Sequence, residues 1–441
     1  MIGALDKVGR VSPRTILLSA LGAFLIYGWP GFIGWDTREH FLQSRAGYYQ
    51  DGHPPAVAVF VRFCELFVAG PALPLLTQAV TLLLGLYLVL RSKLSPRAAA
   101  LASSAVFLFP YVAGVTALIS KDCLMAGTMM IGIGLMLDER TSRHRIAVGF
   151  LLFASMMRWN ALAATFGPMI LLFRWNPRLR GLRRYAVALA AWLVVTVAAF
   201  EINDVLTDEH EHQWYWAYAY SDIAGTLEYL PDIDDATLNQ VFEGVPIREH
   251  DHLHARFHAL YNPASHYHLM RNDGRIFEIP QNDAQRAAIW AAWKRMVLGN
   301  PGAYLRYRLD NFQQLIALDR PPAFSNVYIW FNVIDSPQVI SELEHDAGPS
   351  RIQAVLRDWS VRISLTPLYY TFIYFAACFV IATLSRARLE IALMLSAFGY
   401  ELQWFFLAAT ADLRYSQWMV VCLLTTIPLV GARLRARRRG G

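Results

Sequence analysis

Charged residues are scarce in this sequence. Asp, Glu, Lys and Arg together make up 17% of its 441 residues, whereas hydrophobic residues make up 55%. The apolar residues come in blocks close to the roughly 20 residues that a bilayer-spanning helix needs. This composition is typical of a polytopic membrane protein and not of a soluble domain.

Cysteines are few as well. Cys64, Cys123, Cys378 and Cys422 fall within or beside apolar segments, and none lies in the long polar stretch. No disulfide framework is therefore implied, and the redox compartment stays open. The sequence also shows no internal repeat and no low-complexity tract. Its first apolar run ends without a small-residue cleavage site, so we expect that run to be retained as a helix.

The Lys and Arg residues lie in short clusters between the apolar blocks. The net charge of +6 could indicate nucleic-acid binding, but short basic loops between apolar blocks are typical of the cytoplasmic side of a membrane protein. We interpret the charge as a marker of topology and expect no nucleic-acid partner. The clusters are Lys7 and Arg10, then 91–97, 140–145, 174–184, 386–388 and 433–439.

Applied to these clusters, the positive-inside rule predicts ten membrane spans with both chain ends in the cytoplasm. We therefore expect a multi-pass protein of the cell's inner (plasma) membrane. The expected spans are residues 14–34, 71–90, 97–119, 123–137, two half-spans within 146–173, 185–205, 361–384, 391–409 and 417–430.

The block 146–173 decides the topology, because Arg158-Trp159-Asn160 interrupts it in the middle. Two half-spans would place Arg158 and Asn160 at an outer turn and keep the basic run 174–184 inside. A single crossing would move that run, and the long polar stretch after it, to the other side. The positive-inside rule favours two half-spans.

This topology divides the chain into three parts. Residues 1–205 form an N-terminal transmembrane module whose outer loop, 35–70, contains a block, 54–70, that predicts an amphipathic surface helix. Residues 206–360 form a mainly helical extracytoplasmic domain, with helices expected over 283–297 and 301–318. Residues 361–441 form a C-terminal transmembrane module with a basic cytoplasmic tail.

The same topology gathers charged and polar residues at the outer face, from loops far apart in sequence. Charges at bilayer depth are costly and usually face a protein interior or an aqueous cavity. Carboxylates beside cations suit a transfer reaction in which a carboxylate deprotonates an acceptor hydroxyl while cations stabilise a departing phosphate. The candidates are Asp36, Glu39, His53, Lys121, Asp122, Arg158, Asn160, Asp412, Arg414 and Tyr415.

A first helix followed by an acidic outer loop, and then His53-Pro54-Pro55 leading into an amphipathic helix, resembles the GT-C glycosyltransferases. The similar branch includes the protein O-mannosyltransferases and the lipid A aminoarabinose transferases. Ser120-Lys121-Asp122, Arg158-Trp159-Asn160 and Asp412-Leu413-Arg414-Tyr415 are similar to outer-loop motifs of bacterial members.

The resemblance implies a polyprenyl-phosphate-linked sugar as donor and a glycan, lipid or protein as acceptor, on the extracytoplasmic side. It implies Asp36 as the acidic residue of the first outer loop, acting as the catalytic base, with Glu39 as a possible second carboxylate. Because three outer turns each offer one cation, we expect Lys121, Arg158 and Arg414 to surround the donor phosphate, with Tyr415 beside them. The loop departs from many relatives in lacking adjacent acidic residues and an Asp-x-Asp motif. A divalent metal stays an open possibility.

Other interpretations of these residues remain. Asp36 could be an interfacial carboxylate without chemistry, Lys121-Asp122 a solvated pair, and Arg414-Tyr415 an interfacial anchor. Arg158 could cap the break in its helix. A membrane transporter or flippase of a lipid-linked or anionic substrate is the main functional alternative, and a non-catalytic envelope scaffold is a third.

Two further features of the polar stretch carry alternatives. Its histidines could form a metal site, although we prefer surface or acceptor-site roles. The aromatic run 214–220 either packs the domain on the membrane face or offers a stacking surface for sugar, and packing is the preferred interpretation. The histidines are His210, His212, His250, His252, His254, His258, His266 and His268.

Overall fold

The computed structural model describes residues 11–176, 178–230, 233–265, 269, 275–318 and 349–440. Lys7, Arg10, His266 and His268 lie outside the described residues. Over the described ranges the chain is helical, and β-structure is limited to isolated bridges. The N-terminal part holds α2 (Pro13–Gly28), α3 (Trp35–Ala46), α4 (Pro55–Glu65), α5 (Ala72–Arg91), α6 (Pro96–Phe107), α7 (Pro110–Ala117), α8 (Lys121–Met136), α9 (Thr141–Met156), α10 (Ala161–Leu172) and α11 (Gly181–Leu206).

Two groups of helices follow in the sequence. The first forms a separate lobe: the π-helix η1 (Trp214–Ala219), α12 (Tyr220–Glu228), α13 (Asp235–Val241), α14 (Leu253–Leu260), α16 (Asp283–Trp293), η2 (Lys294–Leu298) and α17 (Pro301–Leu315). The second returns to the bundle: α19 (Arg351–Ser364), η3 (Pro367–Tyr369), α20 (Thr371–Leu384), α21 (Arg388–Leu407), η4 (Leu413–Ser416) and α22 (Gln417–Gly440).

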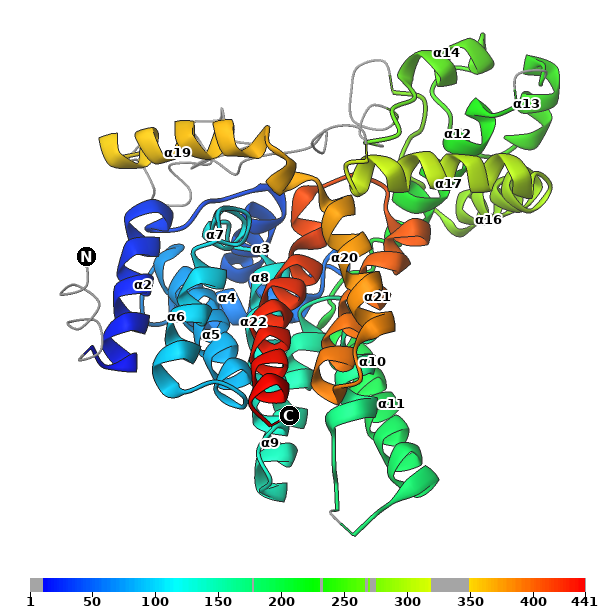
Figure 1. The fold of residues 1–441 in the computed structure, drawn as a ribbon. Helices are drawn as coiled ribbons and strands as arrows, with labels where there is room; N and C mark the ends of the chain where they lie inside the picture. Colours follow the sequence, from blue (N-terminus) through cyan, green and yellow to red (C-terminus); the bar gives the residue numbers. More distant parts are fainter. Residues whose placement is uncertain are drawn as a thin grey trace.

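The bundle is built on close helix pairs, chiefly α5 with α8, α8 with α9, α10 with α21, and α21 with α22 (Figure 1). Glycines allow the closest approach. A Cβ placed on Gly85 of α5 would come within 2.5 Å of Met130 Cβ in α8, and one on Gly127 would come within 2.4 Å of Thr81 Oγ1. Small residues at helix contacts are typical of helices that associate within a membrane.

Three helical stretches are long and apolar enough to cross a bilayer: α5, α11 and the stretch Leu413–Arg438 formed by η4 and α22. The pair α6 and α7 would be a fourth, although it is bent by 67° at Pro110. Proline cannot donate the helical hydrogen bond at that point, which explains the break. The expectation of a helical protein is thus confirmed over the described residues, and three or four of its helical stretches are candidate membrane spans.

The interruption expected within 146–173 is present, because α9 ends at Met156 and α10 begins at Ala161. The expected span 361–384 begins later. Residues 351–364 form the separate helix α19, and the apolar helix α20 starts only at Thr371. Pro367 explains the difference, since the residue before a proline disfavours helical geometry and the helix ends ahead of it.

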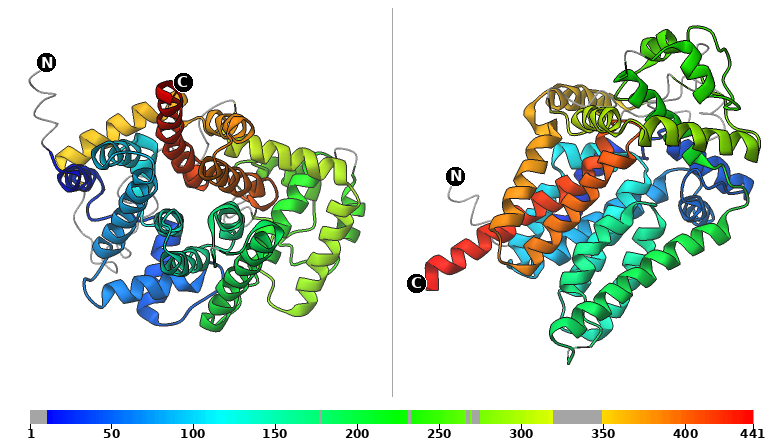
Figure 2. Two further views of the ribbon diagram at one scale, coloured as in Figure 1. Left: turned by 60° about the horizontal axis from the view of Figure 1, so that its bottom comes forward. Right: turned by 90° about the vertical axis from the view of Figure 1, so that its right-hand side faces the viewer.

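The two ends of the bundle differ in character. The basic loops meet at one end, where Arg145 lies 5.0 Å from the ring centre of Trp175 and the Arg97 Nε–H donates to the Val11 carbonyl. At the same end the guanidinium of Arg433 pairs with Glu390 at 2.9 Å. The lobe and α19 lie at the opposite end (Figures 1 and 2). Basic loops that are distant in sequence therefore share one face, as the positive-inside pattern predicts.

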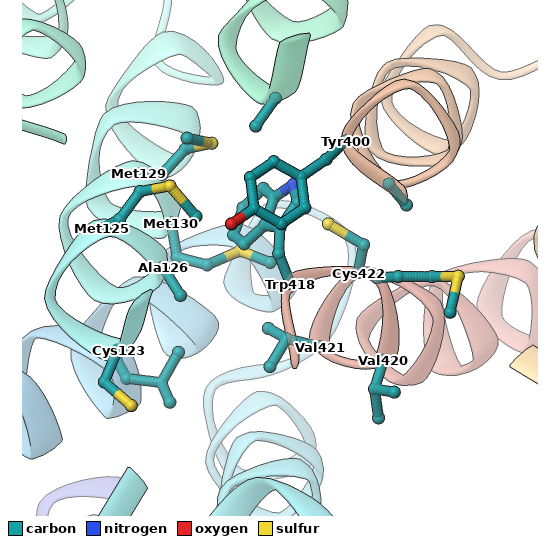
Figure 3. Close-up of a cluster of buried hydrophobic side chains, with 14 of the residues drawn as sticks. Cys123, Met125, Ala126, Met129, Met130, Tyr400, Trp418, Val420, Val421 and Cys422 are labelled. Atoms are coloured by element: carbon teal, nitrogen blue, oxygen red, sulfur yellow. The ribbon is translucent and has the colours of Figure 1, made fainter. Parts of the chain in front are cut away.

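An apolar core with two large polar-tipped rings lies inside the bundle. Tyr400 of α21 and Trp418 of α22 project toward Met129 and Met130 of α8 (Figure 3). The Trp418 Nε1–H donates to the Ser396 hydroxyl at 2.9 Å, so its polar tip is satisfied in the core. The flexible methionines fill the irregular space around the rings.

The lobe has a core of its own, in which the rings of Tyr220 and Phe277 stack with centroids 3.7 Å apart. The expected helices 283–297 and 301–318 correspond to α16 with η2 and to α17. A buried ion pair between Asp222 and Arg308 lies at its contact with the bundle. The lobe therefore has a separate apolar core and is attached to the end of the bundle away from the basic loops.

Candidate functional site

Asp36 lies in the first turn of α3, and two backbone contacts fix that turn against the start of α8. The Phe32 amide donates to the Ala117 carbonyl at 2.8 Å, and the Ile119 amide donates to the Phe32 carbonyl at 3.0 Å. The Thr37 hydroxyl also donates to the Ile119 carbonyl at 2.5 Å. These contacts bring residues 85 positions apart, Asp36 and Lys121, side by side.

Lys121 is the first residue of α8, and a glutamine from α5 holds the chain just before it. The Gln78 amide donates to the carbonyls of Thr116 and Leu118 at 2.6 and 2.8 Å. Ser120 caps the helix, because its hydroxyl accepts from the amides of Asp122 and Cys123. A polar residue inside α5 thus positions the lysine at a rigid helix start.

Asp36 is shared by two cations, and we call Asp36, His53, Lys121, Asp412 and Arg414 the Asp36 cluster. The Lys121 ammonium lies 2.9 Å and the Arg414 Nη1 3.0 Å from the same oxygen, Asp36 Oδ2. Arg414 also pairs with Asp412 at 3.0 Å, and His53 Nδ1 lies 2.7 Å from Lys121. The side chains of Asp36 and His53 are 13% and 24% exposed and those of Lys121 and Arg414 are 9% and 12% exposed, so the cluster is partly exposed.

The charges of this cluster set its protonation. Burial alone would raise the pKa of Asp36, but Arg414 and Lys121 hold that pKa well below its usual range. Burial, together with the charge of Lys121, lowers the pKa of His53 to about 3. His53 is therefore neutral near pH 7. Because the lysine can only donate, His53 Nδ1 accepts its hydrogen bond, and the ring proton sits on Nε2, facing Asp36 Oδ1 at 3.6 Å.

A second ion pair lies deeper, and we call Asp122, Arg158, Asn160, Tyr400 and Trp404 the Arg158 group. Arg158 Nη1 pairs with Asp122 Oδ1 at 2.5 Å, and its Nε–H donates to Asn160 at 3.0 Å. Its guanidinium carbon lies 5.0 Å from the ring centre of Trp404. The Asp122 and Arg158 side chains are only 2% and 5% exposed. This group is closed.

The Arg158 group touches the loop that carries Arg414. The rings of Trp404 and Tyr415 stack with centroids 4.2 Å apart, and Arg158 lies 5.1 Å from the Tyr415 ring centre. Arg414 lies over the same tyrosine ring at 5.5 Å. Tyr415 therefore contacts both arginines, and Arg158 supports it by cation–π contact.

Several polar atoms of the Arg158 group have no hydrogen-bond partner. Asp122 Oδ2, Asn160 Nδ2 and Trp404 Nε1 are all buried in this state. Leaving such an atom without a partner costs about 1–3 kcal/mol. Buried polar atoms without a partner are rare in native proteins, and an ordered water, an ion or a functional role commonly accounts for them.

The loop 408–416 is fixed from two sides. From the lobe, Arg308 Nη1 donates to the Ala408 carbonyl at 2.8 Å, and the Ala411 amide donates to the Ala264 carbonyl at 2.9 Å. From the bundle, the Tyr111 hydroxyl donates to the Leu413 carbonyl at 2.6 Å. The lobe is thus bonded to the loop that places Arg414 against Asp36.

The remaining sequence candidates lie outside these contacts. Glu39 pairs with Arg38 at 3.6 Å and its side chain is 41% exposed. The lobe histidines have separate partners: His250 contacts Asn239, His258 contacts Glu228, and His210 contacts Asp51. Within the described ranges, no group of three or more His, Cys, Asp or Glu residues has a geometry suited to a metal.

Some residues of this arrangement were missed from the sequence. Tyr400 donates to Asp122 at 3.3 Å, and Trp404 and Arg308 contact the groups described above. Tyr400-Glu401 within an apolar block was a usable signal, since intramembrane polar residues are costly. The sequence contains no signal for the role of Arg308, because that role depends on how the lobe docks on the bundle.

Comparisons of the chain with protein-family models, curated proteins and solved structures found no match.

Proposed function

We propose that this protein is a GT-C-type membrane glycosyltransferase that moves a sugar from a polyprenyl-phosphate donor to an acceptor hydroxyl on the extracytoplasmic face. The observation that carries the proposal is the sharing of Asp36 Oδ2 by Lys121 and Arg414. A carboxylate beside two phosphate-binding cations provides both functions that the transfer needs.

The proposed placement in the membrane follows the two ends of the bundle. The basic loops face the cytoplasm, and the Asp36 cluster and the lobe face the periplasm or exterior. Ten crossings satisfy this arrangement, with α2, the bent pair α6–α7, α8, α9, α10, α20 and α21 completing the bundle around α5, α11 and α22. A donor whose lipid tail lies in the outer leaflet would reach a site at this end.

In the proposed step, the acceptor hydroxyl gives its proton to Asp36 and its oxygen forms a bond to the anomeric carbon of the sugar. The bond between that carbon and the phosphate oxygen breaks, and the electron pair leaves with the polyprenyl phosphate. The phosphate gains one negative charge as Asp36 loses one. Lys121 and Arg414, which contact Asp36 in the free protein, are placed to follow the charge to the phosphate.

This arrangement also regulates the base. With both cations on Asp36, its pKa is too low for an efficient proton acceptor near pH 7. A donor phosphate that binds Lys121 and Arg414 would draw them from Asp36, and the pKa of Asp36 would rise toward its ordinary value. The donor would therefore bind first and activate the base for the acceptor.

In this proposal Arg158 has a different role from Lys121 and Arg414. It is buried against Asp122 and two aromatic rings, and its contact to Tyr415 supports the turn that presents Arg414. In this proposal Arg158 is thus a positioning residue. Of the three cations expected from the sequence to bind the donor phosphate, only Lys121 and Arg414 keep that role.

The activity test uses purified protein in lipid nanodiscs with a panel of radiolabelled polyprenyl-phosphate sugars. We expect one donor to release polyprenyl phosphate, and Asp36→Asn to slow the release by about 10²–10⁴-fold. The discontinuous helices at 107–110 and 156–161 also suit a flippase of a lipid-linked substrate. A flippase would move the labelled donor across a vesicle membrane without cleaving it, and intact donor after such movement would reject the transferase.

The proposed topology is tested by labelling single cysteines on intact cells with a membrane-impermeant reagent. Gln281, Ser142 and Asn176 are exposed, and the four native cysteines are buried. Gln281→Cys in the lobe should react from outside, whereas Ser142→Cys and Asn176→Cys should react only after the cells are opened. The reverse pattern would place the lobe in the cytoplasm and reject the proposed site.

A further inference from the structure

One helix at the site end of the bundle has a large apolar face without a protein partner among the described residues. Helix α19 carries three exposed apolar residues, Ile352, Val355 and Trp359, which are 60%, 58% and 65% exposed. The spacing of three and then four residues places these side chains on one face of the helix. Leu365, just past its end, is 62% exposed. Contiguous apolar surface of this kind marks a site of interaction.

The opposite face of α19 is bonded to the end of α2. The Gln353 amide donates to the carbonyls of Tyr27 and Trp29 at 3.0 and 2.6 Å. Ser360, two turns later, shares a side-chain hydrogen bond with Tyr27. Ser350 caps the start of the helix in a reciprocal arrangement with Gln353. The helix is therefore ordered and attached, and its apolar face points away from the protein.

The position of α19 identifies what covers this face. The helix lies across the ends of α2 and α7 at the edge of the bundle (Figures 1 and 2). The short η3 then leads from it into the apolar helix α20. With the bundle placed in the membrane as proposed above, α2 ends and α20 begins beside α19, which puts α19 at the depth where the hydrocarbon of the bilayer gives way to headgroups.

The charges of α19 fit the same depth. Arg351, Arg357 and Arg362 outnumber the single acidic residue, Asp358. An amphipathic helix with arginines beside an apolar face containing tryptophan is typical of a helix that lies in the membrane interface. Arginine can bind lipid phosphates bidentately while its aliphatic part stays near the acyl chains.

We propose that α19 is an interfacial helix whose Ile352–Val355–Trp359 face inserts into the outer leaflet of the lipid bilayer. The leaflet thereby fixes the junction between the lobe and α20 at a set height above the site. This inference depends on the membrane position of the bundle and not on the transfer reaction.

The test measures the depth of spin labels on the full-length protein in nanodiscs of phosphatidylethanolamine and phosphatidylglycerol. Single labels are attached at Val355→Cys and Trp359→Cys, with Asp358→Cys and Gln281→Cys as exposed polar controls. The wild type, whose cysteines are buried, measures background labelling. Thermal melting shows that each variant keeps its fold.

We expect labels at 355 and 359 to collide more often with apolar oxygen than with a water-soluble nickel complex, and the two controls to show the opposite. Equal or greater access of the nickel complex at 355 and 359 would overturn the proposal. Dipolar broadening between labels would assign the face to a second copy of the chain. Protection from both reagents that persists in detergent would assign it to another protein, and either result would reject the lipid surface.

Discussion

The two charged groups of the site differ in what surrounds them. In the Asp36 cluster, one carboxylate oxygen is shared by Lys121 and Arg414, and the cluster is partly open. In the Arg158 group, one arginine is paired with Asp122, stacked on aromatic rings and sealed from solvent. The sequence pattern predicted one common role, phosphate binding, for the cations of both the Asp36 cluster and the Arg158 group.

This difference separates a reactive role from a supporting one. Cations that share one carboxylate oxygen in a partly exposed cluster, with side chains 9% and 12% exposed, can be drawn to an incoming phosphate with less rearrangement. A cation buried with one carboxylate cannot be moved without leaving a charge unpaired, which is strongly unfavourable. The comparison therefore assigns chemistry to the Asp36 cluster and positioning to the Arg158 group, and the following changes test that assignment.

The largest effect is expected from Asp36→Asn. The amide cannot accept the proton of the acceptor, and general base catalysis is typically worth about 10²–10⁴-fold in rate. We expect turnover of the purified variant to fall by that order while its melting temperature stays near that of the wild type. Glu39→Gln is the matched control, because Glu39 is exposed and pairs only with Arg38 among the contacts described. Near wild-type turnover of Asp36→Asn would remove Asp36 from the chemistry.

Arg158→Met should act mainly on stability. Removing one partner of a buried ion pair leaves Asp122 charged and unpaired, at a cost of about 3–5 kcal/mol. Urea unfolding in detergent, followed by tryptophan fluorescence, measures this loss. Arg38→Met breaks the more exposed pair with Glu39 and should cost at most about 1 kcal/mol. Equal losses for the two variants would contradict the closed character of the Arg158 group.

Lys121→Met and Arg414→Met should weaken donor use. A charge-assisted hydrogen bond contributes about 1.5–3 kcal/mol, so the KM for the donor should rise about 10–100-fold in each variant. The KM for the acceptor should change little. Arg414→Lys retains the charge and serves as the conservative control. A change in acceptor KM alone would place these cations away from the phosphate.

The smallest effect concerns pH. The pKa of His53 is about 3 in the folded protein, below the ordinary 6.5, so below pH 6.5 the unfolded chain takes up a proton that the folded protein does not. Stability is therefore lost as the pH falls from 6.5 toward 3, by about 1 kcal/mol at pH 5.5. When the pH is lowered from 7.5 to 5.5, the melting temperature of His53→Gln should fall less than that of the wild type. Parallel losses would show that His53 is protonated in the folded state.

Much of the fold was predictable because hydropathy reports it directly. The break at Arg158 and the helices α5, α8, α16 and α17 follow from apolar length, charge and proline position. The start of α20 was not predicted, because the apolar residues of α19 run on into it and hide the turn at Pro367. An amphipathic helix directly before an apolar helix gives one continuous apolar stretch in the sequence, so hydropathy does not mark the boundary between them.

The membership of the site was predictable, but its internal pairing was not. Topology alone indicated that Asp36, Lys121, Arg158 and Arg414 share one end of the bundle. Which cation meets which carboxylate depends on side-chain packing. One example is the set of Gln78 hydrogen bonds that places Lys121, and another is the contact of the Tyr415 ring with both arginines. Sequence spacing contains no record of those contacts.

The central claim is that Asp36 and the donor phosphate compete for Lys121 and Arg414. The direct measurement is the affinity of radiolabelled polyprenyl phosphate for wild type, Asp36→Asn and Asp122→Asn in nanodiscs, each variant being checked for its fold by melting. Asp36→Asn removes the competitor and should bind the lipid phosphate about 10-fold more tightly, although it cannot catalyse transfer. Asp122→Asn, whose carboxylate pairs with Arg158, should show no such gain. Weaker or unchanged binding by Asp36→Asn would contradict the account.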